Sequence, residues 1–194
     1  MRYIYTTGYI LLAIAMQLFT GNFPVSFLSF PLNIIFAGIW LVMLWILHKE
    51  YKKSFFTRLL CSPQTSVLSI GLFISGCLVI GLLPQLSDIS AKNREGILAQ
   101  LGCYNFMTSW IFIAILFLLL SNLGMITIHA FQHRKRARWR FILNHAGLWL
   151  ALFAGFLGSS DTQTLRIPIY RSEPAHEAFD MNGTSHYLDY EIEL

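Results

Sequence analysis

The chain has 194 residues, of which 55% are hydrophobic and 12% are charged. Soluble domains carry about 25% charged residues, so this composition excludes an ordinary soluble domain and predicts an all-α membrane protein in a lipid bilayer. The net charge of +4 comes largely from basic residues in short loops between apolar runs. That placement is a topology signal of membrane proteins and argues against a nucleic-acid partner.

Five apolar runs have roughly the length of a membrane span, for which about 20 residues are needed. They cover residues 3–20, 26–48, 65–86, 105–131 and 141–159. A signal peptide is the alternative for the first run. However, this run is longer than a typical signal-peptide core and no clear cleavage site follows it, which favours a retained helix. Pro31 either kinks the second run or marks its true start.

Two basic clusters lie in loops on one side of the predicted membrane. They consist of Lys49, Lys52, Lys53 and Arg58 after the second run, and Arg134, Lys135, Arg136, Arg138 and Arg140 around the start of the fifth. Cytoplasmic loops are enriched in Lys and Arg. The predicted topology therefore has five spans in residues 1–160, with the N-terminus inside and residues 161–194 outside.

Residues 161–194 differ in character from the rest of the chain. Apolar and polar residues alternate around Leu165, Ile167 and Ile169, and again around Leu188, Tyr190, Ile192 and Leu194. This alternation predicts half-buried strands. Asn182-Gly183 between them is a plausible turn, with an Asn182-Gly183-Thr184 glycosylation sequon as the alternative. A few strands alone rarely form a stable unit, so this tail is expected to pair with another chain or to begin a larger outer domain.

The fifth predicted helix has two distinct faces on a helical wheel. One is a ridge suited to close helix packing, formed by Asn144, Gly147, Ala151 and Gly155. The other is a neighbouring stripe formed by His145, Trp149, Leu152 and Phe156. An ionisable residue inside a membrane helix is a functional-site hypothesis. His145 heads an aromatic face that suits a flat apolar cofactor with an axial imidazole ligand; alternatively, it is an interfacial residue bonded to a nearby loop or helix.

Other polar residues in the apolar runs suggest smaller roles. His129 at the end of the fourth run either complements the helix dipole or serves as a second ligand. Asn122 is expected to form an interhelical hydrogen bond. Ser, Asp and Glu show no arrangement for nucleophilic catalysis, and the three cysteines show no metal-binding spacing, so we predict a non-enzyme in which these residues hold no metal. The main midplane polar groups, too few for a polar-solute transporter, are Gln17, Asn33, Ser75 and Asn122.

Several segments resemble a known family. GLLPQ at the end of the third run, NFMTSWIFIAILFLLLSNLG in the fourth and FILNHAGLWLALFAGFLGSSD in the fifth look like the three N-terminal helices of the ResB (CcsB) family. The tail TLRIPIYRSEPAHEAFDMNGTSHYLDYEIEL is similar to the start of that family's extracytoplasmic β-rich domain. The resemblance covers residues 62–194, and the first two helices lie outside the family's core pattern.

The resemblance implies a multi-pass subunit of the bacterial cytoplasmic membrane that serves System II cytochrome c biogenesis. Such a subunit works with a CcsA/ResC-type partner to hold or carry haem and deliver it to apocytochrome c outside the membrane. It implies that His145 is a haem axial ligand, which makes haem the candidate occupant of the stripe of Trp149, Leu152 and Phe156. Compared with the family, this sequence lacks most of the outer domain and the helix that follows it. We therefore expect the chain to be a fragment or a split gene product. The alternative function is a membrane scaffold or small transporter with interfacial histidines.

Overall fold

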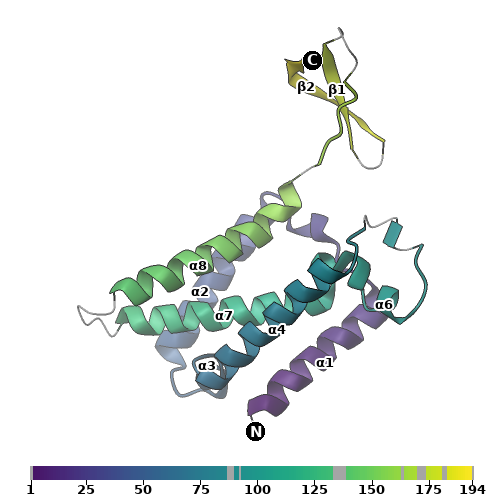
Figure 1. Ribbon diagram of the computed structural model, residues 1–194. Helices are drawn as coiled ribbons and strands as arrows, with labels where there is room; N and C mark the ends of the chain where they lie inside the picture. Colours follow the sequence, from purple (N-terminus) through teal and green to yellow (C-terminus); the bar gives the residue numbers. More distant parts are fainter. Residues whose placement is uncertain are drawn as a thin grey trace. The chain divides into compact units, whose positions relative to one another are not determined.

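The computed structural model describes residues 2–86, 90–91, 93–132, 139–162, 164–169, 174–180 and 183–193. The chain divides into two compact units, Met1–Ser160 and Asp161–Leu194. The first unit is a bundle of helices and the second is a small antiparallel sheet (Figure 1). The division falls at the residue where the composition of the sequence changes.

The first unit contains long helices joined by short ones. The long helices are α1 (Arg2–Thr20), α2 (Leu32–Glu50), α4 (Pro63–Leu82), α7 (Trp110–Gln132) and α8 (Trp139–Gly158). The short ones are η1 (Val25–Leu28), α3 (Phe55–Leu60), α6 (Ile97–Gln100) and η2 (Cys103–Thr108). A last short helix, η4 (Ser159–Asp161), spans the boundary between the two units. Among the described residues, α2, α4, α7 and α8 are long and apolar enough to cross a membrane, and α1 is a shorter apolar helix. The mostly helical membrane fold is confirmed, with four rather than five helices meeting this standard.

Local chemistry explains where the helices begin and end. Pro31 directly precedes α2, so it marks the start of this helix and does not kink it. α4 ends before its predicted limit because Leu83 takes extended backbone angles ahead of Pro84. α7 begins five residues later than predicted, after Ser109, whose hydroxyl accepts a hydrogen bond from the Phe112 N–H at 3.1 Å as a helix N-cap. The short α3 and α6 were not predicted because four to six residues are too few to show a helical period.

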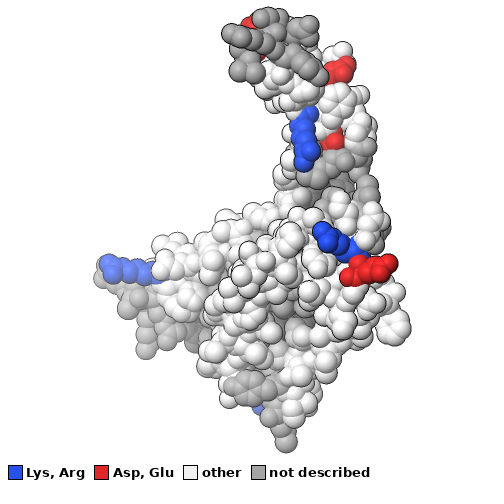
Figure 2. Space-filling model, turned by 45° about the vertical axis from the view of Figure 1, so that its right-hand side comes forward, with Lys and Arg blue, Asp and Glu red and all other residues white. Residues whose placement is uncertain are grey.

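α7 is the central helix of the bundle. It contacts α1, α2, α4 and α8, and it is hydrophobic on all sides, as expected for a helix surrounded by others. The outer helices expose large apolar side chains such as Ile39, Val67 and Leu150. In Figure 2, charged side chains of this unit lie toward its ends and the surface between them is uncharged. This distribution suits a bundle whose outer surface meets lipid.

The second unit is a hairpin of β1 (Ala175–Phe179) and β2 (Ser185–Ile192), paired antiparallel. Gly183 in the connection has a φ of +85°, a conformation that favours glycine, and its N–H donates to the Asp180 carbonyl at 3.1 Å. The turn is thus close to its predicted place, although Asn182 lies outside the described residues. The prediction of a strand at residues 165–169 is wrong. These residues form only an isolated bridge between Arg166 and Phe179, because Pro168 lacks the N–H that a ladder requires.

Candidate functional site

The aromatic stripe of α8 is the face through which this helix packs. The Trp149 indole N–H donates to the Leu120 carbonyl of α7 at 2.9 Å, and its ring stacks on Phe153 with centroids 4.4 Å apart. Trp40 of α2 lies against both rings, at 6.3 Å and 5.6 Å between centroids. Gly124 of α7 leaves room for this contact, because a Cβ there would lie 3.1 Å from the Trp149 indole nitrogen.

This packing does not fit a haem wall formed by the stripe. Trp149, Leu152 and Phe156 all pack against the hydrophobic core of the bundle. Phe156 also lines an apolar cavity between α2, α7 and the loop after α1, but its volume is only about 260 Å³. Sites for drug-sized ligands occupy roughly 300–1,000 Å³, so this cavity does not enclose a macrocycle. A haem at His145 would therefore need a different wall.

The predicted small-residue ridge faces away from the bundle. Asn144, Gly147, Ala151 and Gly155 are exposed, and a Cβ added at either glycine would meet nothing within 4 Å. In the described part of the chain this ridge packs against no other helix, contrary to the prediction. The reason is that large side chains fill the space between α7 and α8, so that Ile142, Phe153 and Leu157 are the buried residues of α8.

His145 lies at the border between these two faces and is half-buried. Its Nδ1 is 2.9 Å from the carbonyl oxygen of Phe141, and its ring stacks on the Phe141 ring with centroids 3.8 Å apart. A carbonyl oxygen only accepts, so this contact is a hydrogen bond when Nδ1 carries the proton. In the neutral ring with this tautomer, Nε2 carries the lone pair, as in a histidine whose other ring nitrogen is bonded for metal ligation. The imidazole thus fits an axial ligand.

The ring of His129, on α7, contacts α2, whereas His145 lies on α8. Its ring meets the ring of His48, near the end of α2, edge-to-face with centroids 5.5 Å apart. His48 is 2% exposed, and its Nε2 lies 3.0 Å from the side-chain oxygen of Gln132. No group of three or more His, Cys, Asp or Glu side chains in the described ranges is arranged to hold a metal ion. The contacts therefore give no support to His129 as a second ligand with His145.

Asn122 forms the predicted interhelical hydrogen bond. Its Nδ2 donates to the carbonyl oxygen of Leu60, the last residue of α3. Carbonyl groups in the last turn of a helix have no partner within that helix. Asn122 therefore satisfies the end of α3 and ties this short helix to α7.

We expect Asn122→Leu to reduce stability by about 0.6 kcal/mol, and by no more than about 1.7 kcal/mol, the range measured for hydrogen bonds between membrane helices. Equilibrium unfolding in mixed detergent micelles would measure the loss. Ser121→Ala is the control, since Ser121 is buried beside Asn122 and its hydroxyl has no hydrogen-bond partner among the described residues. A greater loss for Ser121→Ala than for Asn122→Leu would contradict the role given to Asn122.

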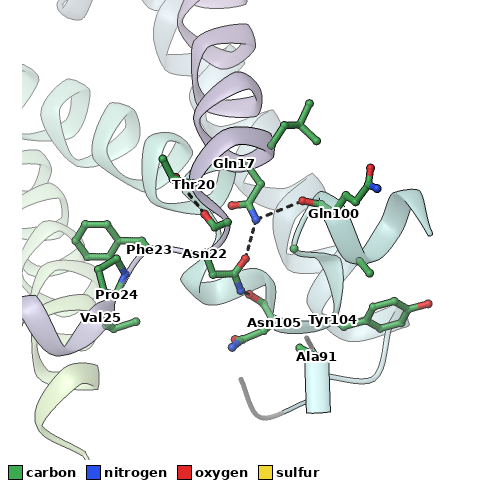
Figure 3. A pocket seen from close by; sticks show the side chains of 14 residues that line it. Gln17, Thr20, Asn22, Phe23, Pro24, Val25, Ala91, Gln100, Tyr104 and Asn105 are labelled. Carbon is green, nitrogen blue, oxygen red and sulfur yellow. Dashed lines mark hydrogen bonds between the residues drawn. The ribbon is translucent and has the colours of Figure 1, made fainter. Parts of the chain in front are cut away.

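A second polar cluster lies at the other end of the bundle, around Gln17 (Figure 3). Gln17 is 2% exposed and its amide nitrogen donates to the Asn22 side-chain oxygen at 2.7 Å. Its amide oxygen accepts from the Trp110 N–H at 2.9 Å, which satisfies a free donor at the start of α7. Asn22 donates in turn to the Thr108 hydroxyl at 2.9 Å.

These amides border a cavity of about 760 Å³ between the end of α1 and the segment that leads into α7. The side-chain amides of Gln17 and Asn22 are bonded to each other and to neighbouring groups. The cluster therefore joins α1 to the start of α7. From the sequence, Gln17 was predicted only to be a midplane polar group, because no local signal points to partners more than 80 residues away.

Several apolar helices long enough to span a membrane, with a bundle core built around α7, define a helical membrane protein. No known protein family, no curated protein and no solved structure matches the chain. The ResB-like resemblance therefore stays a prediction.

Proposed function

We propose that this chain is a membrane subunit of the System II cytochrome c maturation machinery. In this proposal it works with a CcsA/ResC-type partner in the bacterial cytoplasmic membrane, and its C-terminal tail lies outside. It helps to transport or hold haem for delivery to apocytochrome c, and it is not itself an enzyme. The observation that carries the proposal is the Nδ1 contact of His145, which leaves Nε2 available as a ligand on a membrane helix.

Holding haem requires an apolar surface next to the ligand, and the exposed side of α8 beside His145 has one. Phe141 and Leu148 flank His145 on α8 and are 41% and 53% exposed. Both residues lie within about one helical turn of His145, toward the exposed ridge. We propose that haem rests against Phe141 and Leu148 rather than against Trp149, Leu152 and Phe156. Haem iron supplies the coordination site for the imidazole, and the exposed ridge leaves room for a helix of the partner.

A membrane scaffold is the second candidate function. It is favoured by the packing of Trp149 and Phe156 into the core, which gives the aromatic stripe a structural role. In that case the Phe141 carbonyl only provides a hydrogen-bond partner for the His145 ring at the membrane interface.

The two candidate functions predict different absorption spectra for the purified protein. The protein purified in detergent with its CcsA/ResC-type partner is expected to show a haem Soret band. We expect His145→Ala to weaken this band by most of its intensity and added imidazole to restore it, because imidazole replaces the lost ligand. His129→Ala is the control and is expected to leave the band in place. A Soret band that is equally strong in His145→Ala would overturn the ligand assignment and favour the scaffold.

A further inference from the structure

A basic pocket opens at the end of the bundle where α2, α3 and α7 meet. Its volume is about 280 Å³, and it is lined by His48, Lys52, Thr57, Arg58, Cys61 and His129. His48 and Thr57 are buried and form its floor, whereas Lys52, Arg58 and His129 are exposed at its rim. The pocket is thus closed at the base by polar side chains and ringed with cationic groups at its mouth.

The turn between α2 and α3 holds the two cations in place. The Thr57 hydroxyl donates to the Tyr51 carbonyl at 2.8 Å, which satisfies an acceptor just after the end of α2. The Ser54 hydroxyl accepts from the Thr57 N–H at 3.2 Å and caps α3. These bonds fix the backbone on both sides of Thr57. Lys52 is therefore carried by an ordered turn, and Arg58 by a capped helix.

Among the described residues, no acidic side chain lines the pocket to balance its charge. Residues 51–86 and α7 contain no Asp or Glu. Glu50 lies just before this turn but does not line the pocket, and it pairs with Lys49 at 3.8 Å. Burial raises the pKa of the Cys61 thiol, so this group stays uncharged at neutral pH. A guanidinium and an ammonium group without a counter-charge in the pocket favour an anion such as a phosphate.

The position of the pocket favours a lipid phosphate over a free one. His48 and His129 lie near the ends of α2 and α7, two candidate membrane spans, so the pocket is at the level where such spans leave the membrane. Tyr51, Phe55 and Phe56 are exposed beside it, and aromatic side chains are enriched at the membrane interface. A volume just below the roughly 300–1,000 Å³ of drug-sized sites suits a headgroup and not a large solute.

We propose that this pocket binds the phosphate of an anionic phospholipid, with Lys52 and Arg58 as the groups that contact it. Basic pockets between membrane helices bind anionic headgroups in this way. The acyl chains lie along the exposed apolar surface next to Phe55 and Phe56. The site is independent of haem, because none of its lining residues belongs to α8.

Native mass spectrometry of the full chain in detergent tests this site with phosphatidylglycerol as the probe. The test variant is Lys52→Gln/Arg58→Gln. The matched control is Lys49→Gln/Lys53→Gln, which removes the same charge from neighbouring residues that do not line the pocket. Each cation near an anionic surface contributes a factor of about five in affinity. We therefore expect the apparent Kd for the first bound phosphatidylglycerol to rise about 25-fold in the test variant and about twofold or less in the control.

Further arms of the experiment separate lipid from other anions and binding from folding. Phosphatidylcholine should bind much more weakly than phosphatidylglycerol, and inorganic phosphate in large excess should not displace the bound lipid. Arg58→Lys keeps the charge and should retain most of the affinity, and circular dichroism of each variant reports its helix content. If the double variant does not fold, the single variants Lys52→Gln and Arg58→Gln take its place, each with an expected loss of about fivefold. Equal losses in test and control variants, or displacement by inorganic phosphate, would overturn the proposal.

Discussion

Gly102→Ala is expected to destabilise the helical unit by about 3 kcal/mol, well above the effect of the same change at Gly21. Gly102 has a φ of +71°, a conformation that costs other residues about 1–2 kcal/mol. A Cβ at this position would also lie 2.6 Å from the Asn22 side-chain oxygen and 2.8 Å from the Gln17 amide nitrogen. These atoms must move, and each buried polar group left unpaired costs a further 1–3 kcal/mol, roughly.

Gly21 provides a closely matched control. Its φ of +72° is nearly the same, but a Cβ there would meet nothing within 4 Å in the described part of the chain. Gly21→Ala should therefore show only the backbone cost of about 1–2 kcal/mol. Since 1 kcal/mol shifts the Tm of a domain of this size by about 2–4 °C, thermal unfolding in detergent followed by circular dichroism will separate the two variants. Equal shifts in Tm would mean that the Gln17–Asn22 pair does not depend on the close approach of Gly102.

Residues whose partners are adjacent in sequence were predictable, and those with remote partners were not. Pro31 marks the start of α2, one of the two roles predicted for it, through chemistry that acts within a few residues. The cap at Ser109 is equally local, but it was missed because the apolar run begins before it. Asn122 could be given a hydrogen bond because a polar group in an apolar helix needs one, although its partner Leu60 could not be named. Gln17 meets Trp110 across 93 residues, and only the packed bundle defines that pairing.

The two faces of α8 show a different limit of prediction from sequence. In a soluble helix the apolar face is the buried one, but in a membrane both faces of a helix are apolar, because lipid is as apolar as the core. The wheel separated the ridge of Gly147 and Gly155 from the stripe of Trp149 and Phe156 correctly. It did not show which one faces α7. Side-chain volume decided this, because Trp149 fills the space above Gly124.

Gly124→Leu should therefore disturb the packing of α8 more than any other single glycine change in the candidate membrane spans. A Cβ at Gly124 would lie 3.1 Å from both Leu44 Cδ1 of α2 and Trp149 Nε1 of α8, so a leucine side chain has no room. Overpacking of this kind costs about 1–3 kcal/mol, and loss of the Trp149–Leu120 hydrogen bond adds about 1 kcal/mol. We expect the free energy of unfolding to fall by about 3 kcal/mol in total, which thermal unfolding in detergent would show as a lower Tm.

The comparison with Gly81→Leu shows whether this loss comes from the junction of α2, α7 and α8. Gly81 lies on α4, where an added Cβ would meet none of the described residues within 4 Å, and a leucine there points to the surface that meets lipid. Its Tm should hardly change. The His145–Phe141 bond lies within one helix, so Gly124→Leu leaves it intact while it displaces Trp149. A haem that rests against Phe141 and Leu148 would then remain bound in the folded variant, whereas a haem that rests against Trp149 would be lost together with the packing.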